Sequence, residues 1–218
     1  MARSSEPVDS AERLVFFTDA VVAIALTLLV LPLVELVPEA RRSGLGLQQL
    51  LRENLGDLGS FALSFAVIFR FWWSHHGLFR HVSGLSLPLV CWNLLWMFSI
   101  VLLPVPTAII TAYHTSPATV LLYDGTLVLS SGSLTMLAIT AYRNPALSAG
   151  RSRETREGVL ASVSSFGALL LALIIGSVFW HRINYWALLL MFLTGPVERV
   201  VKRRWATHPV AQLSPGER

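Results

Sequence analysis

Long apolar runs alternate with short polar segments along this chain of 218 residues. The hydrocarbon core of a bilayer takes about 20 apolar residues per helix. Six segments meet that length, and we predict membrane-spanning helices at residues 14–34, 57–79, 85–110, 118–141, 159–180 and 184–200. The predicted fold class is all-α, a polytopic membrane protein with one six-helix domain at residues 1–205 and a short cytoplasmic tail at 206–218.

The first span carries polar residues at defined positions in its apolar run, RLVFFTDAVVAIALTLLVL. Asp19 lies near one end, and an ionisable group in a bilayer is costly unless it has a partner. Ile24, Leu28 and Leu31 follow at helical spacing and form one stripe. Thr27 lies beside them. The stripe fits the wall of a narrow pore, and ordinary contact with lipid or core is the alternative.

Prolines and a polar connection interrupt this pattern. Pro32 lies near the end of the first span, and Pro104 and Pro106 lie towards the far end of the third. Proline lacks a backbone N–H, so we predict a bend at Pro32. Residues 38–54 form the long connection, and their leucines alternate with polar residues. We predict a short amphipathic helix there, at the membrane interface.

Composition supports the membrane class. The chain is 54% hydrophobic and 14% charged, whereas soluble domains have about 25% charged residues. The net charge of +4 is too small to indicate a nucleic-acid partner. The single Cys91 excludes an intrachain disulfide. Residues 1–12 are polar, so we expect no removable signal peptide.

The distribution of basic residues predicts the orientation. With both termini in the cytoplasm, the inner segments carry twelve Lys and Arg residues and the outer segments carry four. Basic residues favour the cytoplasmic side. We therefore predict a multi-pass protein of the plasma membrane with both termini cytoplasmic.

A polar cluster is predicted near the cytoplasmic ends of the first three spans. Asp19 would lie at the depth of His75, His76 and Asn93, close to Trp72. Imidazole, indole and amide groups can donate hydrogen bonds to a carboxylate. The cluster has two readings. It is either a buried polar clasp that fixes helix packing, or a device that positions the first helix as a pore wall or couples it to protons.

Other chemistry has little support in the sequence. His75 and His76 are adjacent and point about 100° apart on a helix, so we expect no metal site there. Arg70 lies inside the second span, where we favour a structural partner over a transport role. Asp124, in the fourth span, has no assigned role. Hydrolase, phosphate-loop and dinucleotide motifs are absent from the sequence, so we predict no enzyme and no cofactor.

The opening of the first span resembles the transmembrane protein 175 family of endolysosomal potassium channels, in its prokaryotic single-repeat form. That family begins its first helix with Arg, three residues, then Phe-Ser-Asp. Here Arg13, Phe17, Thr18 and Asp19 match, and AIALTLLVL follows. Thr18 stands where Ser is usual and keeps the hydroxyl. Ala20 stands where Gly is common. The likeness extends through the second span to Trp92, Asn93 and Pro104.

The resemblance implies a homotetramer in which four copies of the first helix line a central pore. It makes Ile24 the hydrophobic constriction, with Leu28 and Leu31 further along the pore-lining stripe. It assigns selectivity to Thr27, with permeant potassium near it. It also implies a structural polar network of seven residues: Arg13, Phe17, Thr18, Asp19, Trp72, His75 and Asn93.

The expected function is that of a potassium-permeable cation channel with a hydrophobic gate. A ring of Ile24 side chains can close a pore by dewetting. Small residues at Ala20, Ala23 and Ala25 let neighbouring helices approach closely. The expected partners are three further copies of the chain, the lipid bilayer and potassium ions. Two alternatives stay open: a proton channel or proton-coupled carrier using Asp19 and His75, and a non-transporting membrane scaffold.

Overall fold

The computed structural model describes residues 6–113, 116–144, 147 and 153–178, and this part of the chain forms eight helices. Their bounds are α1 Glu6–Leu28, α2 Leu31–Arg42, α3 Leu47–Glu53, α4 Leu55–Phe79, α5 Leu87–Leu102, α6 Pro104–Ala112, α7 Pro117–Arg143 and α8 Arg153–Val178. The predicted all-α class is confirmed for these residues.

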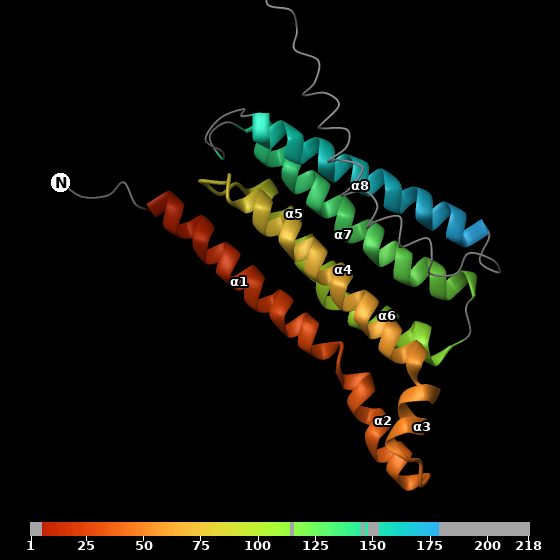
Figure 1. Cartoon of the computed structure of the whole chain (residues 1–218). Helices are drawn as coiled ribbons and strands as arrows, with labels where there is room; N and C mark the ends of the chain where they lie inside the picture. Colours follow the sequence, from red (N-terminus) through yellow and green to blue (C-terminus); the bar gives the residue numbers. More distant parts are fainter. Residues whose placement is uncertain (1–5, 114–115, 145–146, 148–152, 179–218) are drawn as a thin grey trace, which may run out of the picture.

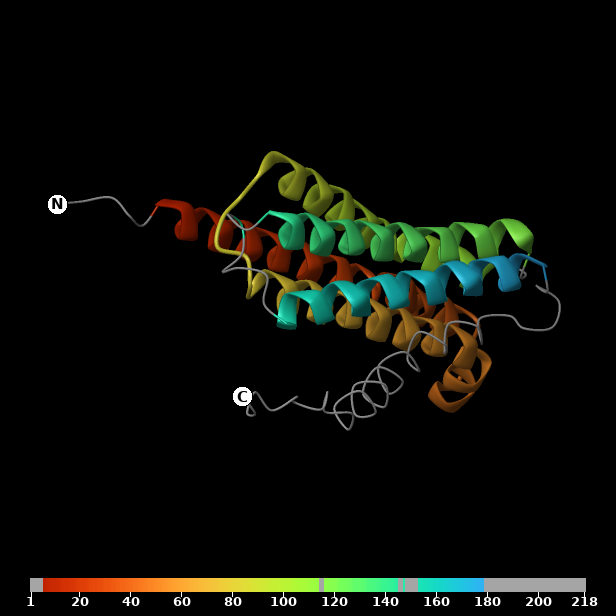
Figure 2. The same cartoon turned by 90° about the horizontal axis from the view of Figure 1, so that it is seen from above.

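The long helices run side by side in a bundle (Figures 1 and 2). In the view of Figure 1, α1 lies on one flank and α8 on the other, with α4 to α7 between them. α7 packs most extensively against α8 and α5, and α1 packs against α5 and α4. The short helices α2 and α3 lie together beyond one end of the bundle (Figure 1).

Four segments are long and apolar enough to cross a membrane: Ala11–Arg42, Leu55–Phe79, Leu87–Ala112 and Pro117–Arg143. They coincide with the first four predicted spans. α8 coincides with the predicted fifth span. The predicted sixth span, at 184–200, and the predicted tail, at 206–218, lie outside the described residues, so the count of six stays a prediction.

Proline divides the first span in two, as predicted. α1 ends at Leu28 and α2 begins at Leu31, with Pro32 in its first turn. Pro32 has no N–H to donate to the Leu28 carbonyl, and its ring would crowd that carbonyl in a continuous helix. The helical segment is longer than predicted at both ends, because α1 begins at Glu6 and α2 continues to Arg42.

The third span divides for the same reason. α5 ends at Leu102, and α6 begins at Pro104 with Pro106 two residues on. The Leu103 N–H turns to the Ile100 carbonyl at 3.2 Å, a tighter bond than the α-helical pattern gives. This break positions Thr107 in α6, where its hydroxyl meets α4.

The connection at residues 38–54 differs from the single amphipathic helix that the leucine pattern predicts. Its first part is the end of α2, and only its second part forms a new helix, α3. Gly44 makes the turn between them with φ 69°, a left-handed conformation that suits glycine. Leu47 and Leu51 of α3 are exposed, as expected for a helix at a membrane interface.

The core of the bundle lies where α1, α4, α5 and α7 meet. Ile68, Trp96 and Leu127 are fully buried there. Inside a bilayer, helices gain little from excluding water and associate through close packing and hydrogen bonds. α7 suits that role because small residues fill its middle turns: Ser130, Ser131, Gly132, Ser133 and Ala138.

Candidate functional site

α1 has two different faces. Thr18, Val22, Ala25 and Leu29 repeat at helical spacing and are at most 3% exposed, because this face packs against α4 and α5. The first helix therefore uses one stripe to join its own bundle and leaves the other uncovered.

The uncovered stripe of α1 contains Ile24 and Leu28 of the predicted pore residues, and Leu31 follows as the first residue of α2. Ile24 is 59% exposed, Leu28 39% and Leu31 50%. Thr27 is also exposed, and its Oγ1 donates to the Ile24 carbonyl at 2.7 Å. That bond directs the hydroxyl proton to the helix backbone and leaves an oxygen lone pair available at the surface. One chain leaves all four side chains uncovered.

The inner face of α1 is joined to α4 through a carboxylate. Trp72 Nε1 donates to Asp19 Oδ1 at 2.8 Å. Asp19 and Trp72 are both partly buried, so the indole N–H supplies a partner that a carboxylate in a membrane helix needs. The predicted meeting of Asp19 with a donor from the second span is observed.

A second set of hydrogen bonds joins α1, α5 and α4. Asn93 Nδ2 donates to Thr18 Oγ1 at 3.0 Å, and His75 Nε2 lies 2.7 Å from Asn93 Oδ1. Because the Asn93 amide donates to Thr18, its oxygen accepts, and His75 must donate from Nε2. Thr18 in turn donates to the Leu14 carbonyl at 2.8 Å. Each group in this series of hydrogen bonds therefore donates in the same direction, from His75 towards the Leu14 carbonyl.

Aromatic rings enclose His75. Its imidazole stacks on Trp96, with ring centroids 4.2 Å apart, and on Phe79 at 4.4 Å. His75 and Trp96 are fully buried, and His75 Nδ1 and Trp96 Nε1 have no hydrogen-bond partner among the described residues. His76 instead lies against Trp72 in a tilted arrangement, with ring centroids 5.5 Å apart. The two adjacent histidines thus face different neighbours.

The structure brings together five of the seven predicted network residues: Thr18, Asp19, Trp72, His75 and Asn93. We call these five the clasp. Arg13 and Phe17 lie on the exposed side of α1, and Phe17 is 59% exposed. Their place in the network stays a prediction. Across the described ranges, no group of three or more His, Cys, Asp or Glu side chains is placed to hold a metal ion.

Sequence reasoning missed the buried hydroxyl groups of α7. Ser64 Oγ lies 3.1 Å from the Tyr123 hydroxyl and accepts from Thr107 Oγ1 at 3.0 Å, which joins α4, α7 and α6. Ser99 and Ser130 meet at 2.7 Å between α5 and α7. The sequence spacing could have predicted this alignment, because residues 123 and 130 are seven apart and therefore share a helix face.

Asp124 follows Tyr123 and is 6% exposed. Its Oδ1 is buried without a hydrogen-bond partner in the described part of the chain. The clasp and the hydroxyl pairs thus account for most, but not all, of the buried polar groups in these spans.

The fold and the clasp define a polytopic helical membrane protein whose first span is fixed to the next two by buried hydrogen bonds. Residues 13–104 match the family model described as endosomal/lysosomal potassium channel TMEM175. That segment contains the whole clasp and the exposed stripe of α1. The resemblance to this family that was predicted from the sequence is confirmed over this segment.

A similar protein agrees with this match. A curated potassium channel of Streptomyces collinus is 36% identical over 97 residues, which are 44% of this chain and 46% of that protein. The match thus spans about half the length of that relative.

Two solved structures share the fold. The crystal structure of a lysosomal potassium-selective channel TMEM175 homolog from Chamaesiphon minutus superposes with a TM-score of 0.69 at 24% identity, covering 88% of this chain and 97% of that one. A variant of the potassium channel MtTMEM175, crystallised with a nanobody fusion protein, gives a TM-score of 0.58 at 18% identity, covering 90% and 94%. At these identities the comparison concerns the fold alone.

Proposed function

We propose that this chain is a subunit of a potassium-permeable cation channel in the plasma membrane, with α1 of each copy lining the pore. The single observation that carries the proposal is the division of α1 into two faces. The buried face is fixed by the clasp, and the opposite face leaves Ile24 and Leu28 uncovered, with Leu31 uncovered at the start of α2. A stripe that lines a pore in an assembly must be uncovered in the single chain.

Four copies around one axis would turn the uncovered stripe inward. Ile24 then forms an apolar ring that closes the pore by dewetting, and Thr27 offers its hydroxyl oxygen to the permeant ion. Ala20 and Ala23 are exposed and small, which supports close approach of neighbouring α1 helices. Ala25 is fully buried within its own chain. Ala25 therefore packs against helices of its own chain and does not contribute to the proposed contact between subunits.

The clasp has a positioning role in this proposal. It holds α1 against α4 and α5 at Asp19 and Thr18, about one to three helical turns before Ile24 and Leu28. Movement of the stripe then requires α1 to rotate or tilt as a unit against α4 and α5. The proposed arrangement places both termini and the clasp on the cytoplasmic side, as the distribution of basic residues predicts.

The test is potassium flux into liposomes that hold the purified protein. Ile24→Asn replaces the apolar ring with a polar one, and we expect flux to increase because the constriction becomes wet. Ile174→Asn is the matched control. Ile174 in α8 is 55% exposed, close to the 59% of Ile24, and lies outside the proposed pore. The control should conduct like the unchanged protein.

The results separate the competing functions. Potassium flux above sodium flux that rises only with Ile24→Asn supports the channel and its constriction. A rise of equal size in both variants would mean that polar substitutions disturb the bundle in general. Proton flux without potassium flux would favour a relay through Asp19 and His75. If no variant conducts potassium or protons, the result would favour a non-transporting membrane scaffold.

A further inference from the structure

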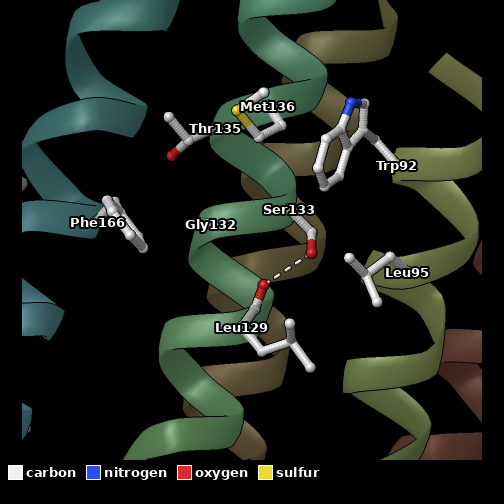
Figure 3. Close-up of a pocket in the computed structure, with 8 residues that line it drawn as sticks. All are labelled: Trp92, Leu95, Leu129, Gly132, Ser133, Thr135, Met136 and Phe166. Carbon is white, nitrogen blue, oxygen red and sulfur yellow. Dashed lines mark hydrogen bonds between the residues drawn. The ribbon is translucent and has the colours of Figure 1, made fainter. Parts of the chain in front are cut away.

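A cavity of about 280 Å³ lies between α5, α7 and α8, away from α1. Trp92 and Leu95 of α5 stand on one side of α7, and Phe166 of α8 faces it from the other (Figure 3). Gly132 of α7 lies between them. A Cβ added at Gly132 would lie 3.1 Å from Phe166 Cε2. The missing side chain thus lets the Phe166 ring of α8 pack directly against the backbone of α7.

The two hydroxyl residues in the wall of this cavity have their protons bound within the described part of the chain. Ser133 Oγ donates to the Leu129 carbonyl at 2.8 Å, the bond drawn in Figure 3. Thr135 Oγ1 donates towards the carbonyls of Ser131 at 2.8 Å and Ser162 at 3.1 Å. Both hydroxyl protons are turned to the backbone. The chemistry left to a ligand is hydrocarbon, aromatic carbon and the Met136 thioether.

Two exposed arginines lie beyond one end of the cavity, at the end of α7 and the start of α8. Leu129, Met136 and Arg143 are seven residues apart and share one stripe of α7. Arg143 is exposed, and it follows Met136 by about 10 Å along the helix. Arg156 is exposed in the first turn of α8. Trp92 stands beside Met136 (Figure 3), and Met136 is the cavity residue of α7 that is nearest to Arg143 in the sequence.

We propose that this groove binds an acyl chain of an anionic phospholipid, whose phosphate lies at Arg143 and Arg156. Each leaflet of the hydrocarbon core is about 15 Å thick. An acyl chain whose headgroup meets Arg143 therefore passes Met136 and reaches the part of the cavity that Gly132 lines. Trp92 suits this position because indole groups gather near headgroups. The basic end also matches the cytoplasmic leaflet, which carries anionic lipid.

The test compares two lipids on the purified full-length protein by native mass spectrometry: dioleoyl phosphatidylglycerol and dioleoyl phosphatidylcholine. The unchanged protein should retain the anionic lipid preferentially. The double variant Arg143→Gln with Arg156→Gln should weaken that retention by about fivefold for each arginine. The control double variant, Arg41→Gln with Arg52→Gln, removes two exposed arginines from α2 and α3 and should retain the lipid normally.

A second variant tests the groove itself. Met136→Trp fills the cavity and should reduce retention while both arginines remain. Leu94→Trp adds the same bulk on α5 at a residue that is 62% exposed and does not line the cavity, so it should have no effect. If Met136→Trp fails to fold, Leu95→Phe narrows the same cavity more gently.

The proposal does not depend on ion flux, because lipid retention is measured directly. Equal retention of the two lipids would overturn the headgroup site, and so would an unchanged result with Arg143→Gln and Arg156→Gln. Unchanged retention with the filling variants would overturn the groove. No retained lipid on the unchanged protein would also overturn the proposal.

Discussion

Trp72 Nε1 in α4 donates a 2.8 Å hydrogen bond to Asp19 Oδ1 in α1. The neighbouring Trp73 is 57% exposed and makes no such contact. Adjacent side chains on a helix point about 100° apart, so only one of the two indoles can face α1. The orientation of α4 thereby decides which tryptophan holds the carboxylate of the first span.

We predict that Trp72→Phe destabilises the protein by about 1–3 kcal/mol, because Asp19 loses a donor at a partly buried position. Trp73→Phe is the matched control and should change stability little. Unfolding in detergent micelles with added sodium dodecyl sulfate measures both. Equal losses for the two variants would mean that ring packing, and not the hydrogen bond, is what α4 supplies to α1.

A second prediction concerns the bond between Asn93 and Thr18. Thr18→Val keeps the shape of a fully buried residue but removes the acceptor for Asn93 Nδ2. We expect a loss of about 1–3 kcal/mol, because a buried donor is left without a partner. In a protein that already carries Asn93→Leu, the same change should cost close to nothing.

The four variants form a double-mutant cycle, which isolates the pairwise contribution. Thr18→Ser keeps the hydroxyl and should cost less than Thr18→Val in the protein with Asn93. Additive losses in the cycle would show that Thr18 and Asn93 act independently, against the hydrogen bond seen between them.

The sequence was sufficient for the spans that hydropathy defines. Four of the six predicted spans match helices of the right length, and the break at Pro32 follows from its missing N–H. The helix boundaries within residues 38–54 were harder to predict, because alternating leucines do not show where one helix ends and the next begins. Gly44 marks that point, but a glycine in a polar segment has many uses.

Part of the clasp was also predictable. Counting residues from the ends of the spans placed Asp19, His75 and Asn93 at one depth. Depth does not determine the rotation of each helix, so the partners were not predictable. The structure pairs Asp19 with Trp72 and leaves His75 to Asn93. Arg13 and Phe17 illustrate another limit, since a single chain leaves them exposed and only an assembly can supply further neighbours.

A third prediction tests the buried hydroxyl groups of α7. Tyr123→Phe removes the hydroxyl that meets Ser64 and should destabilise the protein by about 1 kcal/mol, a typical value for a hydrogen bond between membrane helices. Tyr113→Phe is the control, because Tyr113 is 68% exposed at the end of α6. The same detergent unfolding measurement applies. A larger loss for Tyr113→Phe would contradict a structural role for the Tyr123 hydroxyl.

The last prediction concerns Asp124, whose buried Oδ1 has no hydrogen-bond partner among the described residues. A carboxylate in that position is costly when charged. Asp124→Asn keeps the size and removes the charge, so we expect a thermal midpoint equal to or above that of the unchanged protein. Asp57→Asn is the comparison variant, and we expect it to lower the thermal midpoint. Asp57 lies in the first turn of α4, where negative charge is favourable, and its loss should lower stability.

The comparison is informative because the two substitutions are chemically identical. If Asp124→Asn lowers the midpoint as Asp57→Asn does, the Asp124 carboxylate has a stabilising partner beyond the described residues, such as a bound cation or a neighbouring copy. Repeating the measurement with potassium replaced by sodium would then distinguish these. A cation specific to the site changes the loss with the ion present, whereas a contact between copies leaves it unchanged and varies with protein concentration.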